Sequence, residues 1–220
     1  MIALEFIKQF YTIIFIWLSG ATATLALRKN LQFSYRMFAW LIIFLSVMWT
    51  IAYILAFKKI TNHFLFNIFD PVEFFILPLF YYYQFNNSFL KKIIRIYLWI
   101  FPPFVLINAW RIQNFYELAT NSYVFGGTFI LILSVAYLWQ LYTSDETQSI
   151  FRDPVFWISM AYLFYCAIAV LFLGMLNELW KKDPVFTRKY YFIIYNGAMI
   201  INRVLLTAAF LCMKPIMKQS

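Results

Sequence analysis

Seven apolar runs of about 20 residues, separated by short connections, constrain the fold of this chain more than any other feature. A run of that length crosses the bilayer core as one helix, whereas a transmembrane barrel strand alternates over about 10 residues. Of the 220 residues, 64% are hydrophobic and 12% charged, against about 25% charged in soluble domains. The sequence therefore predicts an all-α, polytopic membrane protein, a seven-transmembrane-helix bundle that forms a single membrane domain over residues 1–220.

The expected spans are residues 7–27, 37–57, 64–85, 93–110, 122–142, 154–180 and 190–213. Pro102 and Pro103 remove two helix donors, so we expect a kink or a break in the fourth span. Asp153 before Pro154 predicts a capped start for the sixth. The small residues 19–26 would also suit a signal-peptide cleavage site, but Glu5 and the length of the run favour a retained span.

The third span carries two acidic side chains at membrane depth, Asp70 and Glu73. They are three residues apart and share a helix face. Insertion scales assign about 2.5 to 3.5 kcal/mol to an Asp at the centre of a span, so such groups predict a functional site by default. Pro71 and Pro78 lie on the same helix, and the backbone carbonyls that they free can line a cavity.

The seventh span supplies the matching basic and amide groups, Asn196, Asn202 and Arg203. Helical side chains lean toward the N-terminus, so Arg203 reaches back toward the depth of Glu73. If the third and seventh spans are neighbours, a Glu73–Arg203 ion pair is expected, with Asp70 left for water, an ion or a ligand. The predicted ligand- or ion-binding residues are Asp70, Glu73, Asn196, Asn202 and Arg203. A purely structural ion-pair cluster is the competing interpretation.

Other polar and aromatic residues have simpler interpretations. The run 81–83 of three tyrosines is typical of an interfacial belt. Asn108 and Asn121 suggest a solvated loop at one interface. Tyr162 and Tyr165 occur at helical spacing, which more often reflects packing than a pocket.

Metal and cofactor chemistry has little support in this composition. His63 is the only histidine, so haem ligation by paired histidines, a HExxH zinc site and a His-based triad are all disfavoured. Cys166 and Cys212 fall inside apolar spans, where structural thiols are expected. We predict no cofactor and no bound metal.

The net charge of +9 comes from basic residues scattered over the ends of the spans. In a chain of this class they predict contact with anionic lipid headgroups rather than with nucleic acid. Basic residues are almost evenly divided between the two faces, so orientation depends on the first helix, which has three basic residues after it and only Lys8 at its start. We expect the N-terminus outside and the C-terminus in the cytoplasm.

Several short motifs resemble a pattern found in small, uncharacterised seven-helix integral membrane proteins of Gram-negative bacteria. They are Asn67-Ile68-Phe69, Glu73-Phe74, Phe80-Tyr81-Tyr82, Asn121-Ser122-Tyr123, Asp153-Pro154-Val155-Phe156-Trp157 and Tyr195-Asn196. The resemblance implies seven helices and a bacterial inner membrane, with emphasis on Glu73 and Asn196, and it implies no activity. Asp70 and Arg203 depart from the pattern.

Three functions fit these observations. A receptor-like or partner-modulating protein would act through a membrane or cytoplasmic protein partner, because the chain has no room for a soluble output domain. A small transporter or channel would use Glu73 and Asp70 as a proton or cation site. An intramembrane enzyme would use the same two acids, but the sequence offers it no convincing nucleophile. The first hypothesis is favoured.

Overall fold

The computed structural model describes residues 2–113, 118–144 and 150–215; within them, side-chain packing is described except at residues 2–10 and at several positions between 176 and 192. A helix occupies each of the seven expected segments, and no strand occurs in the described ranges. The helices are α1 (Ile2–Leu27), α2 (Phe33–Phe57), α3 (His63–Gln84), α4 (Ser88–Ile107), α5 (Thr120–Tyr142), α6 (Pro154–Lys182), α7 (Pro184–Tyr190) and α8 (Asn196–Cys212).

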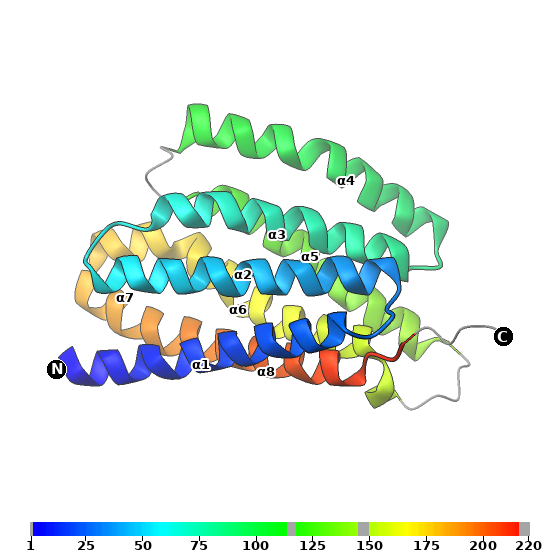
Figure 1. Cartoon of the computed structure of the whole chain (residues 1–220). Helices are drawn as coiled ribbons and strands as arrows, with labels where there is room; N and C mark the ends of the chain where they lie inside the picture. The colour runs from blue at the N-terminus through cyan, green and yellow to red at the C-terminus, as the bar shows by residue number, and fades with distance from the viewer. Residues whose placement is uncertain (1, 114–117, 145–149, 216–220) are drawn as a thin grey trace.

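Six of these helices are long and apolar enough to cross a membrane, and α1 contributes a shorter apolar stretch over Tyr11–Leu27 in the part whose packing is described. They run side by side along one axis, so that α1 begins at one end of the bundle and α8 ends at the other (Figure 1). The predicted class, an all-α membrane bundle, is confirmed.

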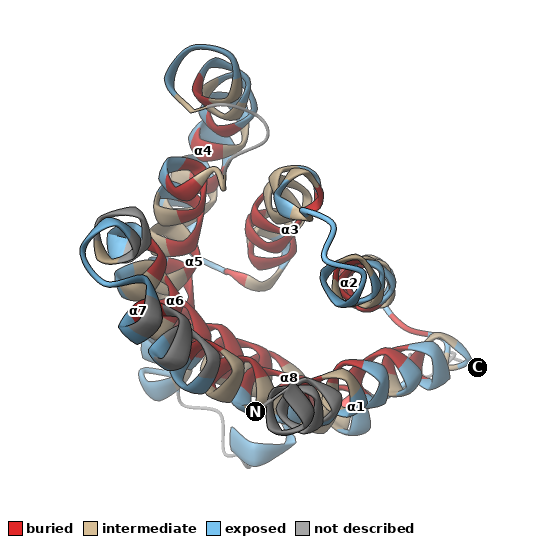
Figure 2. Cartoon of the chain, turned by 90° about the vertical axis from the view of Figure 1, so that its left-hand side faces the viewer, coloured by how far each residue is buried: buried red, intermediate tan, exposed pale blue. Residues whose placement is uncertain are grey.

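Six helices form a closed ring, in the order α1, α2, α3, α5, α6, α8 and back to α1 (Figure 2). The fourth helix, α4, lies outside the ring and packs mainly on α3. In this arrangement α3 and α8 are not neighbours: α1 and α2 separate them on one side, and α5 and α6 on the other. Side chains of α3 and α8 that point inward therefore meet across the interior of the ring.

Glycines bring α5 close to its neighbours. A Cβ on Gly126 would lie 2.6 Å from the ring of Phe74 in α3, and a Cβ on Gly127 would lie 2.7 Å from Val170 in α6. Small residues commonly allow such close approach between transmembrane helices, where van der Waals packing replaces the hydrophobic effect as the main attraction. These two positions fix α5 between α3 and α6.

Prolines do not break the helices that contain them. The fourth helix continues through Pro102 and Pro103, so the expected break is absent, and the irregular part is a π-helical turn, Asn108–Ile112, after its end. In α3, Pro78 has no N–H for the carbonyl of Phe74, and the hydroxyl of Tyr97 in α4 donates to that carbonyl instead, at 3.2 Å. This freed carbonyl therefore joins two helices and does not line a cavity. In a bilayer such groups must find partners within the protein.

Tyr81 does not belong to an interfacial belt. Its side chain is completely buried, and its hydroxyl lies 3.0 Å from Ser134 of α5 and 3.0 Å from Ser159 of α6. A buried tyrosine usually finds a partner for its hydroxyl. This one joins three helices at a single point.

The start of α6 confirms the predicted cap. Asp153 accepts a hydrogen bond from the backbone N–H of Val155 at 2.9 Å, and Pro154 occupies the first helical position. The second carboxylate oxygen accepts from the hydroxyl of Tyr137 at 2.9 Å. The cap therefore also attaches α6 to α5.

Candidate functional site

Glu73 lies on the inner side of α3 and is 7% exposed. Its Oε1 accepts a hydrogen bond from the hydroxyl of Tyr162 in α6, at 2.7 Å. Asp70, one turn earlier, is half-buried and close enough to Glu73 for the two carboxyl groups to interact electrostatically. The two acids thus share a face of α3, as their spacing predicts.

Arg203 is the basic group of the interior. Its side chain, on α8, is 3% exposed, and it is near enough to Glu73 and Tyr162 to interact with both electrostatically. Its Nε and Nη1 atoms are buried without a hydrogen-bond partner in the described part of the chain. The expected Glu73–Arg203 ion pair is therefore not formed in this structure. The physical reason is that α3 and α8 face each other across the ring and do not pack side by side.

The two predicted asparagines have partners of their own. The Nδ2 of Asn202, also buried, donates to the backbone carbonyl of Ala161 in α6 at 3.2 Å. Asn196 begins α8 after the π-helical turn Tyr191–Tyr195, and its Oδ1 lies 3.5 Å from the hydroxyl of Tyr53 in α2. Asn202 therefore holds α8 to α6, and Asn196 faces α2.

Tyrosines complete the interior, and the sequence pattern did not single them out as site residues. The hydroxyls of Tyr165 and Tyr195 are 2.8 Å apart. The buried hydroxyl of Tyr123 lies near Tyr165 but makes no hydrogen bond of normal geometry there. Tyr53 lies close to both Arg203 and Thr12. One feature of the sequence could have identified these tyrosines: a tyrosine in the middle of a span lies far from the membrane surface, so its hydroxyl needs a polar partner inside the protein.

Partners are missing for only a few buried side-chain atoms. Within the described residues, these atoms are Thr12 Oγ1, Tyr123 OH and the Nε and Nη1 of Arg203. They come from three different helices of the ring, α1, α5 and α8. Native structures satisfy most buried polar groups, so a set of unpaired ones at the interior of a bundle calls for an explanation.

A separate polar network occupies the end of α4, where the sequence suggested a solvated loop. Asn108 is completely buried, and its Nδ2 donates to Gln113 Oε1 and Ser122 Oγ at 3.0 Å each. Its Oδ1 accepts from Asn121 at 3.2 Å. Every described polar atom of Asn108 has a partner, so this network is a structural contact between the end of α4 and the start of α5 and not a candidate site.

The arrangement determines the chemistry that the interior can offer. No group of three or more His, Cys, Asp or Glu side chains in the described ranges is placed to hold a metal ion. The Arg203 guanidinium presents two nitrogens with unpaired N–H donors, from which a carboxylate or phosphate oxygen can accept. Comparisons with protein-family models, with curated proteins and with solved structures found no match to this chain.

Proposed function

We propose that this protein is a receptor-like membrane protein that binds a small anionic ligand inside its helix ring and acts through a partner protein. The observation that carries the proposal is the buried guanidinium of Arg203, whose Nε and Nη1 have no protein acceptor in the described structure. A charge at membrane depth is costly and usually marks a ligand or ion pathway. An anion bound at Arg203 would supply an acceptor that the described part of the chain does not.

The neighbours of Arg203 support a ligand over a purely structural contact. The closest acidic group, Glu73, already accepts a hydrogen bond from Tyr162 and does not pair with Arg203. Thr12 and Tyr123, buried on two other helices of the ring, also have hydroxyls without a partner among the described residues. A small molecule with one anionic group and a polar remainder would meet donors and acceptors from several helices, which is the arrangement that lets a ligand shift helices relative to one another.

The contacts of α8 suggest how ligand binding would reach a partner. Arg203 lies on the same helix as Asn202, which is held to α6, and Asn196, which follows a π-helical turn. Turns of this kind are frequent at functional sites and adjust more readily than a regular helix. A small shift of α8 at Arg203 would also move the other end of this helix, at Cys212, on the side that we propose to face the cytoplasm, where a membrane or cytoplasmic partner would sense it.

The test is ligand-induced stabilisation of the full-length protein in detergent, with inorganic phosphate and acetate as probes. Binding to the folded state alone raises the Tm in a concentration-dependent way. We expect an increase for the unmodified protein and none for Arg203→Gln, while Arg36→Gln, the same change at an exposed arginine of α2, keeps the increase. Equal responses of the unmodified protein and Arg203→Gln to both anions would contradict a site at Arg203.

A second function is supported by the two acids of α3. Glu73 and Asp70 are one turn apart at membrane depth, and neither has an ion-pair partner among the described residues. A proton or cation transporter would use such groups as its binding site. Flux into liposomes that Glu73→Gln abolishes would favour this function. Absence of flux, with a partner protein that co-purifies in an anion-dependent way, would favour the receptor.

We further propose that the protein resides in a bacterial inner membrane, with its N-terminus outside and its C-terminus in the cytoplasm. The support is the basic cluster between the first two helices, Arg28, Lys29 and Arg36, compared with the single Lys8 at the start of the first. Labelling of cysteines introduced at Lys29 and at Lys58, which lie at opposite ends of α2, would establish which end a membrane-impermeant reagent reaches.

A further inference from the structure

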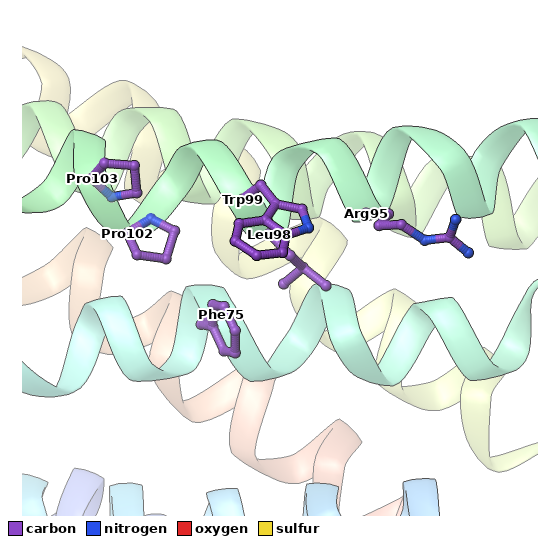
Figure 3. A pocket seen from close by; sticks show the side chains of 6 residues that line it. All are labelled: Phe75, Arg95, Leu98, Trp99, Pro102 and Pro103. Atoms are coloured by element: carbon purple, nitrogen blue, oxygen red, sulfur yellow. The ribbon is translucent and has the colours of Figure 1, made fainter.

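A groove of about 620 Å³ follows the outer face of the bundle between α3 and α4. Phe75 projects from α3 toward α4, and the rest of the lining comes from α4 (Figure 3). The α4 residues are Arg95, Leu98, Trp99, Pro102 and Pro103. Because α4 lies outside the ring, this groove is separate from the interior site around Arg203.

The spacing of the lining residues produces one continuous strip. Counted from Arg95, the other α4 residues are three, four, seven and eight positions further on, which is the spacing of a single helix face. From Leu98 to Pro103 the strip is apolar, and Trp99 is 79% exposed. The strip runs for about 12 Å along the helix, at 1.5 Å per residue. It is long and narrow, as a hydrocarbon chain is.

The other end of the strip is cationic. The ammonium of Lys91 and the guanidinium of Arg95 both lie over the ring of Tyr82, at 5.7 Å and 5.8 Å from its centre. An Nη2–H of Arg95 donates to the Tyr82 hydroxyl at 3.0 Å. Neither cation has a carboxylate partner in the described part of the chain, and α4 itself contains no Asp or Glu. Two positive groups are thus held together with no anion to balance them.

This cationic pair lies toward one end of the bundle, where we expect the lipid headgroups. The first turns of α4 contain Lys91 and Arg95, and helical side chains lean back toward the N-terminus. Tyr82 is in the last turn of α3, so both helices reach the same membrane surface here. Long basic side chains near helix ends extend toward that surface in the same way.

We propose that this groove binds one anionic phospholipid, with its phosphate on Lys91 and Arg95 and an acyl chain along Leu98, Trp99 and Pro102 against Phe75. Charge complementarity selects this occupant. A second copy of α4 would bring no carboxylate to the two cations, and a zwitterionic lipid would bring a positive group beside its phosphate. The lipid would fill this groove beside the α3–α4 contact, and would thereby help to hold α4 in place.

Quenching of Trp99 fluorescence by brominated lipid tests the proposal on the full-length protein in vesicles. The vesicles consist of phosphatidylcholine with a small fraction of brominated phosphatidylglycerol or, in the matched sample, brominated phosphatidylcholine. The Trp99 signal is the difference between the protein and its Trp99→Phe variant. A cation at the membrane surface contributes about 1 kcal/mol to anionic-lipid binding, so two give a preference on the order of tenfold or more for the anionic lipid.

The variants decide whether the preference comes from this groove. The double variant Lys91→Gln/Arg95→Gln is expected to bind the two lipids almost equally, so that the ratio of quenching by the anionic lipid to quenching by the zwitterionic lipid falls close to one. Arg28→Gln removes the same charge from an exposed position between α1 and α2, away from α4, and is expected to keep most of the preference. Quenching in vesicles made wholly of brominated phosphatidylcholine verifies that each variant inserts. If the double variant fails this check, the two single variants are tested instead. Each is expected to lower the preference for the anionic lipid several-fold. Equal quenching by the two lipids, weak quenching by both, or an equal loss in Arg28→Gln would overturn the proposal.

Discussion

Replacing Arg203 by methionine in the Glu73→Gln background should stabilise the ligand-free bundle. Methionine has a similar length and no donors, so the change removes the unpaired Nε–H and Nη1–H groups without opening a large cavity. A buried donor without a partner costs about 1–3 kcal/mol, which gives ~2–6 kcal/mol for two. Some of that cost is relieved by local relaxation, and we expect a gain of about 2 kcal/mol in the free energy of unfolding.

The Glu73→Gln background is needed because the charges attract each other. Two opposite unit charges attract by up to about 4 kcal/mol at an effective dielectric constant of about 20. That gain is comparable to the cost of the unpaired donors, so Arg203→Met alone gives a small change of either sign. With Glu73 neutralised, the attraction is absent and the cost of the unpaired donors remains.

Equilibrium unfolding in mixed micelles, with the dodecyl sulfate fraction as denaturant, measures all four members of this cycle. The expected order places the double variant above Glu73→Gln alone. If Arg203→Met instead lowers stability in the Glu73→Gln background, Arg203 makes favourable contacts that do not depend on Glu73, and the argument from unpaired donors is refuted. The double variant should also lose the stabilisation by phosphate or acetate.

Two further predictions concern the packing of the ring. Gly126→Ala should destabilise the protein by about 1–3 kcal/mol because its Cβ would overlap the ring of Phe74, whereas Gly197→Ala, which meets nothing within 4 Å, should be neutral or stabilising by up to about 1 kcal/mol in the same assay. Tyr97→Phe should cost about 1 kcal/mol through the lost hydrogen bond to the Phe74 carbonyl. In the Pro78→Ala background, where a backbone N–H is restored for that carbonyl, the cost should become smaller, and an unchanged cost would show that the bond is not what Tyr97 contributes.

The positions of the helices could be predicted from sequence because a bilayer sets their length. Each of the seven expected segments holds a helix, and the Asp153 cap lies where the Asp-Pro pair predicts it. Which helices are neighbours could not be predicted. Lipid-facing and interior-facing side chains are both apolar in such a bundle, so the sequence carries little periodic signal for the interface.

The charged residues of the candidate site could be predicted from the sequence, but the partners of these residues could not. Asp70, Glu73 and Arg203 stand out because ionisable residues are rare at membrane depth. Their expected partners depended on α3 and α8 being adjacent, and the ring order separates them. Tyr162, which does bond Glu73, was hidden among 16 tyrosines, most of which serve packing or the interface.

Hydroxyl groups hold much of this bundle together, and this bears on the meaning of the unpaired atoms. Tyr81 joins α3 to α5 and α6, Tyr97 joins α4 to α3, and Tyr162 joins α6 to α3, each through a hydrogen bond that the described structure satisfies. Such joints can specify helix neighbours where apolar packing alone is permissive. A bundle that bonds these three tyrosine hydroxyls, yet leaves two nitrogens of the Arg203 guanidinium and the hydroxyls of Thr12 and Tyr123 unpaired, has the form expected of a binding site whose missing partner comes from outside the chain.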